Sequence, residues 1–431
     1  MKNLCPMPLA ESNGKLLIRK LAGNAEYDQC ISGYGDSYIN MPQKIPFLKK
    51  EVLRELGEYF SLHKEVMDDL YFTAELIKKE RDVRCYTWHL YYRLISLSFS
   101  SGVSHAGFGD WFLPEKELGE FAPVMTALVA MGVLSLARER YRKENFPEDI
   151  IKDTLGVYTD GFNRMRARGR KPTIKLTALN WMRVYLSGRL VELGRFNFKL
   201  MEINPLGTVL KNRKDGRKVM LSHGGFLYNK KGFVLQEDDP WKEGGFTAVF
   251  EETAHAYKGN PVSPEGYALN CVKIYPKEEW EKILEDGDIL IDMHIPAGGG
   301  MTPEKALASF RKAVDFFSER YPERFKPVFI CHSWIFNTQF EEKLPDSNLA
   351  KLMRECYLFP HSSNGRDGLF FLFEKDFKDP SEAPRDTSVR RAALEVLEAG
   401  ERLRTGGMLL FAEDLDSFGT NIYRKSFREK E

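Results

Sequence analysis

The sequence predicts an α+β protein, in which a helical N-terminal domain precedes a domain with a mixed sheet. Two observations favour this fold class. Between residues 83 and 97, apolar residues recur at gaps of three and four, which is the spacing of one helix face. After Gly194 the spacing changes, and residues 196–200 alternate between apolar and polar as a half-buried strand does. A helix-rich stretch followed by a strand-rich one is typical of this class.

The length of 431 residues predicts two or three domains. We divide the chain into a helical N-terminal domain over 1–170, a mixed-sheet domain over 171–375, and a C-terminal helix and strand over 376–431 that pack on the second domain. Residues 1–45 show no clear period and are expected to form an irregular arm. The basic, glycine-containing stretch 164–171 is interpreted as an exposed linker.

Further elements follow from shorter patterns. Residues 176–193 show a helical stripe that Gly194 ends, and residues 388–403 show another. The run 122–137 holds no charged residue and is predicted to be a buried core helix. A brief helix is expected at 277–284. Short strands are expected at 218–221, 232–235, 246–253, 267–275 and 408–411.

Composition argues against several functions. Lys and Arg total 63 against 62 Asp and Glu, which argues against nucleic acid as a partner, because proteins that bind its phosphates usually carry a basic excess. The six cysteines form no C-x-x-C pair, so we expect neither a metal site nor a disulfide framework. Free thiols in a reducing cytoplasm are the simpler interpretation. The run 122–137 is shorter than the roughly 20 residues of a membrane-spanning helix, so no membrane partner is expected.

The stretch from Asp288 to Phe317 is the most informative part of the chain. Every second residue of 289–295 is apolar, which predicts a strand with one apolar face that ends at Pro296. Thr302 is a good helix N-cap, and Pro303 stands at the first helical position, where proline is favoured. The unit is therefore a strand, a turn and a helix. The turn consists of Ala297, Gly298, Gly299, Gly300 and Met301.

A turn of this kind suits an anion. Consecutive glycines let the backbone approach a ligand closely, because no Cβ intervenes. The N–H groups of the following helical turn then point at the anion, and the helix dipole adds to the attraction. A phosphate or pyrophosphate is the natural ligand. A plain tight turn explains the glycines equally well, because a glycine turn before a helix is a weak signal on its own.

Several segments resemble the GNAT-like C-terminal domain of a bacterial family of acyltransferase-domain proteins, whose N-terminal half is helical. The resemblance spans about residues 122–373 and implies a GNAT-like mixed sheet that uses acetyl-CoA or another acyl-CoA. The matching segments are SGRLVELGRFNF at 187–198, HIPAGG at 294–299, CHSW at 331–334, LPDSN at 344–348 and the expected strand 369–373.

In the GNAT superfamily, the fourth strand leads into a turn of the form [QR]-x-x-G-x-[GA] that holds the CoA pyrophosphate. Gly298 and Gly300 match the two small positions, whereas Ile295 stands in place of the polar residue. The resemblance therefore implies a cradle of backbone N–H groups without that side-chain contact. The residues implied to contact the cofactor here are Ile295, Ala297, Gly298, Gly299, Gly300, Met301 and Thr302.

The next strand, at 327–331, is expected to part from the fourth strand, with the pantetheine arm in the opening between them. This arrangement implies that Cys331 and the residues after it lie near the thioester end of the cofactor. Asn337 is a further candidate for a contact with the cofactor, and a helix cap is an equally good interpretation of this residue.

Acyl transfer to an amine needs a base that takes a proton from the nucleophile, and an acid or a water for the departing thiolate. His294 is our first candidate for the base, because its ordinary pKa of about 6.5 suits neutral pH. Asp292 lies on the same face of the strand and could hold one imidazole tautomer. A strand-end histidine bonded to backbone is the alternative. Ser333 could act as a general acid through water, and a strand-end cap is the alternative.

Three residues are candidates for substrate binding. Trp334 could wall the acyl pocket, and packing in the core is the alternative. Arg189 and Arg195 flank a helix end and could bind an acidic group. A surface ion pair is the more common role of such arginines.

The resulting hypothesis is an acyl-CoA-dependent acyltransferase that works by direct transfer in a ternary complex. Its acceptor would be an amine, or a hydroxyl, of a small molecule. A GNAT-like fold that binds CoA or another small ligand without catalysis is one alternative, and the departure at Ile295 slightly favours it. A cysteine hydrolase that uses Cys331 is another, although His332 points to the opposite face of the strand. The sequence does not determine the oligomeric state.

Overall fold

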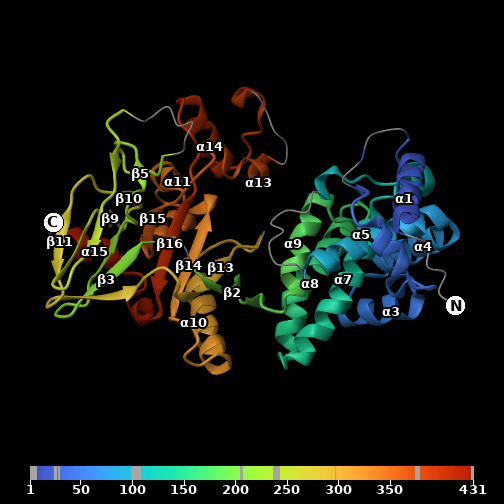
Figure 1. Cartoon of the computed structure of the whole chain (residues 1–431), viewed down its shortest axis with the longest axis horizontal. Helices are drawn as coiled ribbons and strands as arrows, with labels where there is room; N and C mark the ends of the chain where they lie inside the picture. The colour runs from blue at the N-terminus through green and yellow to red at the C-terminus, as the bar shows by residue number, and fades with distance from the viewer. Residues whose placement is uncertain are drawn as a thin grey trace. The chain divides into compact units, whose positions relative to one another are not determined.

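In the computed structural model, the chain forms two compact units, Met1–Glu192 and Leu193–Glu431 (Figure 1). The structure describes residues 7–23, 27, 30–98, 108–203, 207–235, 243–296, 298–373 and 379–428. The first unit is helical and the second contains the sheets, so the predicted α+β class is confirmed. The units divide after Glu192 and not at residue 170, so the helix at 176–186 belongs to the helical unit.

The helical unit is built around α7. Its first eleven residues, 124–134, are all buried, and α4, α5, α8 and α9 pack around it. The buried core helix predicted at 122–137 is thus confirmed. The helices of this unit are α1 Met7–Ala22, α2 Tyr34–Ile39, α3 Lys50–Tyr59, α4 Lys64–Lys79, α5 Arg81–Ser98, α6 Glu115–Leu118, α7 Val124–Lys143, α8 Glu148–Ala167 and α9 Leu176–Leu186, with short 3₁₀ turns at Pro46–Leu48, Phe108–Asp110 and Gly119–Phe121.

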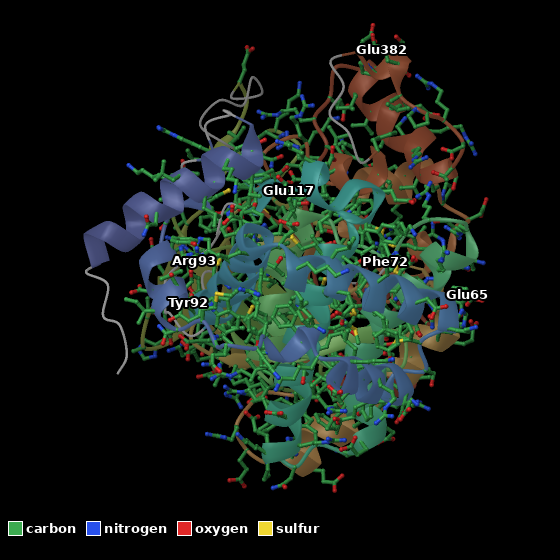
Figure 2. All side chains as sticks on the ribbon, turned by 90° about the vertical axis from the view of Figure 1, so that its right-hand side faces the viewer. Glu65, Phe72, Tyr92, Arg93, Glu117 and Glu382 are labelled. Carbon is green, nitrogen blue, oxygen red and sulfur yellow. The ribbon has the colours of Figure 1, made fainter. Side chains whose placement is uncertain are left out.

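Two aromatic residues near the surface of this unit, Phe72 and Tyr92, each contact a neighbouring side chain (Figure 2). Phe72 on α4 is largely exposed, and its ring centroid lies 4.5 Å from that of Phe121. Toward the other edge of the view, Tyr92 on α5 accepts a hydrogen bond from the Asn40 amide. Among the described residues no single helix has the length and apolarity to cross a bilayer; α7 with Glu115–Phe121 reaches both only as a pair bent by 79°.

The irregular arm expected over 1–45 contains two helices, α1 and α2. Gly14 lies within α1, where a Cβ would come 2.7 Å from the ring of Tyr34. The glycine that weakens the local helical signal is therefore needed for the close contact with α2. The expected linker 164–171 is also partly wrong, because α8 continues to Ala167. Arg166 and Lys171 both pair with the buried carboxylate of Asp69, at 3.2 and 2.8 Å.

A six-stranded sheet in the order β1-β2-β13-β14-β16-β15 lies in the second unit, apart from the first two residues of β1, Val191 and Glu192 (Figure 1). β13 and β14 are parallel, while β13 with β2, β14 with β16, and β15 with β16 are antiparallel. α10 covers one face through Phe310, whose ring centroid lies 4.7 Å from that of Phe329 and 5.6 Å from that of Phe196. The bounds are β1 Val191–Leu193, β2 Phe196–Glu202, β13 Ile289–His294, α10 Pro303–Arg320, β14 Val328–Ser333, β15 Tyr357–Pro360 and β16 Gly406–Phe411.

Three smaller sheets complete this unit. The largest of them has five strands and is joined to β15 by Tyr357. The hydroxyl of Tyr357 donates to the carbonyl of Val262 and accepts from the N–H of Met220. The smaller sheets are β3 Thr208–Asn212, β4 Lys218–Leu221, β9 Pro261–Ser263, β10 Tyr267–Ala268 and β12 Trp280–Leu284; β7 Phe250–Glu252, β8 Ala256–Gly259 and β11 Lys273–Pro276; and β5 Leu227–Tyr228 with β6 Phe246–Thr247. The remaining helices are α11 Thr338–Lys343, α12 Asn348–Arg354, α13 Leu369–Phe373, α14 Ser388–Glu398 and α15 Ile422–Arg428, with 3₁₀ turns at Trp334–Phe336, Pro380–Glu382 and Ala412–Ser417.

Three local expectations for this unit are wrong. The helix expected at 277–284 is the strand β12, which pairs with β3. The strand expected at 369–373 is the helix α13, because the period of a short apolar run does not separate the two forms. The strand expected at 232–235 is reduced to a single bridge between Tyr228 and Val234. Tertiary pairing decided each case, as short strands depend on their neighbours.

The helical unit contains a buried histidine. His89 is fully buried, with Nε2 2.8 Å from the carbonyl of Cys30 and Nδ1 2.8 Å from the hydroxyl of Ser37. Burial lowers the pKa of His89 to about 3. The unfolded chain therefore binds more protons than the folded chain between this value and the ordinary pKa of about 6.5.

The stability of the helical unit should consequently fall as pH falls below about 6.5, because the neutral imidazole must stay buried. Urea unfolding, followed by circular dichroism from about pH 7 to pH 5, should show a free energy of unfolding that decreases with acid. His89→Gln should be less stable at pH 7 but have a flatter pH dependence. The exposed His63, replaced by Gln, is the matched control. An unchanged slope in His89→Gln would contradict the assignment.

Candidate active site

The two parallel strands β13 and β14 separate near their C-terminal ends. β13 pairs with β2 over six residues, from Ile289 to His294. With β14 it pairs only at Ile291 with Phe329 and at Asp292 with Ile330. Beyond that point, the facing backbone edges of β13 and β14 are not paired with each other. The separation expected between the fourth strand and the next one is therefore present.

The glycine turn follows β13 directly. Gly298, Gly299 and Gly300 are exposed and have φ values of 85°, 74° and 66°, a region that favours glycine. Thr302 caps α10 as predicted, since its hydroxyl accepts from the N–H of Lys305 at 3.4 Å. Between described residues, no backbone hydrogen bond uses the N–H groups of the three glycines. Those N–H groups are therefore available to a ligand. Ala297 lies outside the described residues.

Two cations hold the carbonyl groups of this turn. Arg195, in the β1–β2 turn, donates through Nε to the carbonyl of Gly300 at 2.5 Å. Lys305, in the first turn of α10, donates through Nζ to the carbonyl of Gly299 at 3.1 Å. Glu304 is exposed beside them, and its own backbone N–H and the Thr302 hydroxyl hold its pKa below the usual range. Arg195 lies at the turn, and its predicted role in substrate binding stays a prediction.

Asp292 and His294 come together on β13. The side chain of Asp292 is 7% exposed, and its Oδ2 lies 2.9 Å from Nε2 of His294. The same oxygen lies 3.4 Å from Nζ of Lys199, on the neighbouring strand β2. The convergence expected of these two side chains is therefore present. The carboxylate is positioned to orient the imidazole and to stabilise a proton on it.

Other candidates serve local structure. The hydroxyl of Ser333 accepts from the N–H of Ile335 at 3.3 Å, which is the strand-end cap given as its alternative role. The buried side chain of Asn337 caps α11 by accepting from the N–H of Gln339 at 3.1 Å. These bonds engage both side chains in local caps, Ser333 at the unpaired end of β14 and Asn337 at the start of α11.

The remaining candidates belong to different parts of the chain. Trp334 follows β14 and stacks on Phe371 of α13, with ring centroids 6.1 Å apart. Gly368 makes room for it, because a Cβ there would come 2.7 Å from the indole. Arg189 is exposed in the helical unit. The turn contacts of Ile295 and Met301, both half-buried, stay predictions.

Cys331 is a poor nucleophile in this setting. The side chain is 3% exposed, and burial, followed by the nearby Asp292 carboxylate, raises the pKa of its thiol. A thiol that stays protonated attacks carbonyl carbons slowly, because the thiolate is the reactive form. The register also puts Cys331 and His332 on opposite faces of β14. The hydrolase alternative therefore lacks its essential group.

Two histidines lie near the strand ends: the sequence suggested His332 only as a base for Cys331, and it suggested no role for His361. His332, on β14, reaches the surface but is closely surrounded by other residues, and its ring centroid lies 4.3 Å from that of His361, which follows β15. Desolvation and the neighbouring His361 lower the pKa of His332 to about 4, against a smaller opposing effect of Asp292. Alternation along β14 could have placed His332 on the face of His294, but no sequence pattern connects it to His361.

Comparison with known families agrees with this geometry. The family model described as the GNAT-like C-terminal domain matches residues 190–409. The chain belongs to this family. The matched range of the GNAT-like domain includes the parting strands, the glycine turn and α10, and it confirms the predicted resemblance. No curated protein matches the sequence.

Solved structures share the fold over nearly the whole chain. An acyltransferase in complex with decanoyl-CoA and teicoplanin is 17% identical, with a TM-score of 0.57 over 92% of this chain and 98% of that one. An acyltransferase mutant in complex with octanoyl-CoA is 16% identical, with a TM-score of 0.57 over 92% of this chain and 99% of that one. At this identity the likeness shows the fold, including the helical part that precedes the GNAT-like domain. Among the described residues, no cluster of three or more His, Cys, Asp or Glu side chains is placed to hold a metal ion.

The thiols provide a test of this description. Of the described cysteines only Cys271 is exposed. A Cys5→Ser, Cys271→Ser variant should therefore react with Ellman's reagent only after denaturation, because burial keeps the remaining thiols inaccessible. The parent protein, which retains Cys271, is the positive control. Rapid labelling of Cys331 in the native variant, located by peptide mapping, would contradict the assignment and restore the hydrolase alternative.

Proposed function

We propose that this protein is an acyl-CoA-dependent acyltransferase that passes the acyl group directly to an amine in a ternary complex. The observation that carries the proposal is the exposed glycine turn, whose carbonyls are held by cations and whose N–H groups are available. Membership in the GNAT-like domain family supports it. The solved acyltransferases of the same fold, with octanoyl-CoA and decanoyl-CoA, supply the class of donor.

The pyrophosphate of CoA would bind at residues 298–300. Arg195 and Lys305 bond to the turn carbonyls, so two positive charges lie beside the turn whose peptide N–H groups would bind the anion. The N-terminal end of α10 adds its dipole. These cations compensate for Ile295, which stands where a polar side chain would otherwise contact the phosphates. The departure from the motif therefore does not remove the anion site.

The pantetheine arm would lie between the unpaired ends of β13 and β14. Its amides would form hydrogen bonds with the backbone edges of β13 and β14, which no longer pair with each other beyond Asp292 and Ile330. This places the thioester near the last residues of β13, whose backbone N–H groups are candidates to polarise the carbonyl. The free thiols of the chain suit a reducing cytoplasm, which we propose as the site of the reaction.

His294 would act as the base. The amine nitrogen attacks the thioester carbonyl carbon and gives its proton to His294, whose imidazolium is stabilised by the Asp292 carboxylate. The carbon–sulfur bond then breaks, and the thiolate takes a proton from water. The products are an amide and free CoA. A hydroxyl acceptor would give an ester by the same steps. The acceptor is proposed to be a small molecule, as teicoplanin is in a structure of the same fold.

Acyl-CoA binding provides the first test. Calorimetric titration of acetyl-CoA and octanoyl-CoA into the protein should show binding, and Arg195→Ala should weaken it about tenfold, the usual effect of losing about 1.4 kcal/mol. Arg311→Ala is the matched control, since Arg311 lies on α10 and pairs with the exposed Asp416. Absence of binding to the folded parent protein would remove the proposed function.

His294→Ala tests the chemistry separately. The variant should lower kcat roughly a hundredfold or more, because a general base contributes about 10²–10⁴. The affinity for acyl-CoA should change little, because His294 is not part of the pyrophosphate site. Release of CoA from octanoyl-CoA, with a panel of small primary amines, measures kcat. Tight binding without thioester consumption in the parent protein would favour the non-catalytic alternative.

A further inference from the structure

His332 occupies a position opposite the proposed base. Asp292 is paired with Ile330, so His332 and His294 each stand two residues beyond the last parallel pair. Residues two apart on a strand share a face, and paired residues of neighbouring strands share one too. His294, Asp292 and His332 are therefore on the same face of the sheet, on the two strands that part.

A glycine in β16 lets a second histidine reach His332. Gly407 is the register partner of both His332 on β14 and Phe359 on β15. A Cβ at Gly407 would come 2.1 Å from the Phe359 ring, so no side chain fits there. The ring of Phe359 lies edge-on to His332, with centroids 5.5 Å apart. The ring of His361 lies 4.3 Å from it.

The groups around His332 favour its neutral form. His361 is itself a neutral neighbour, since burial lowers its pKa, against smaller effects of the Ser362 carbonyl and Asp367 that raise it. On β13, Asp292 is the acidic residue that acts on His332, and it also forms an ion pair with Lys199. On β16, the register partner is Gly407, which has no side chain to interact with His332. His332 is thus too weak a base for an ammonium acceptor, because an effective base titrates near the working pH.

We propose that His332 is a catalytic residue that donates a hydrogen bond, as a neutral imidazole, to the carbonyl oxygen of the bound thioester, and that His361 is its positioning residue. This inference rests on the proposed acyltransferase function. As the amine adds, the carbonyl oxygen gains negative charge, and the N–H of His332 stabilises it. No proton moves to or from His332. The proton of the amine goes to His294, and collapse of the oxyanion expels the thiolate.

His294 and His332, on neighbouring strands, would therefore have different chemical roles. A neutral histidine that polarises a carbonyl, while a separate group accepts the proton, is a known arrangement. Nε2 of His294 lies 2.9 Å from a carboxylate oxygen of Asp292. His332 lies against the ring of Phe359 and a second imidazole, which favour a neutral ring.

Substitutions that keep or remove an N–H group test the proposal. His332→Ala should lower kcat for octanoyl-CoA about a hundredfold, as expected for loss of one oxyanion donor, with acyl-CoA affinity nearly unchanged. His332→Gln and His332→Asn each place an amide N–H near one ring nitrogen, and the better of the two should recover at least a tenth of the parent rate. His361→Ala should give a smaller loss. The exposed His255→Gln is the control and should match the parent.

Two further readouts identify the protonation state. The acid limb of the pH profile of kcat/KM should be the same in the parent and in the active amide variant, because His332 does not titrate there. Nitrogen-15 NMR of the parent with CoA bound, with the His332 signal assigned by its absence from His332→Gln, should show a neutral ring from about pH 5.5 to pH 8.

Several results would overturn the inference. A His332→Ala variant as fast as the parent, or an acid limb lost in both amide variants, would remove the donor role. An imidazolium signal at pH 7 would do so independently of activity. Failure of the proposed function itself looks different, because the parent protein would then consume no acyl-CoA with amines or with water as acceptor.

Discussion

The candidate site depends on one break in backbone pairing. β13 keeps its antiparallel partner β2 through His294, but keeps its parallel partner β14 only through Asp292. Backbone polar groups at such a break need water or a ligand. An arm with amides of its own, such as pantetheine, meets that need, and the turn that follows β13 offers N–H groups to the phosphates. The strand end therefore connects the two parts of the proposed donor site.

Glycines serve two different purposes around this break. At residues 298–300 they allow a left-handed backbone in open space, since a Cβ at Gly298 or Gly300 would meet nothing within 4 Å. At Gly407 the opposite holds, because the position is crowded by the ring of Phe359. The first group shapes an anion site from backbone alone. The second lets side chains from β14 and β15 meet above the strand between them.

The carboxylate of Asp292 interacts with several neighbouring groups. Asp292 is nearly buried and lies close to both His294 and Lys199. A buried carboxylate without partners would cost several kcal/mol, so these contacts stabilise the burial of Asp292 on the sheet face. The same charge lies near Cys331 and disfavours its thiolate, which separates acyl transfer by the amine from a cysteine mechanism.

Much of this protein was determined by sequence alone. The helical N-terminal part, the strand 289–294, the glycine turn and the Thr302 cap follow from local periodicity and capping chemistry, which depend on near neighbours. The helix at Leu369–Phe373 and the strand at Trp280–Leu284 could not be assigned, because short apolar runs take the form that their partners impose. Only the tertiary structure decided that Arg195 reaches the turn and that His361 meets His332. Those contacts join residues far apart in the chain, and their geometry exists only after the strands have paired.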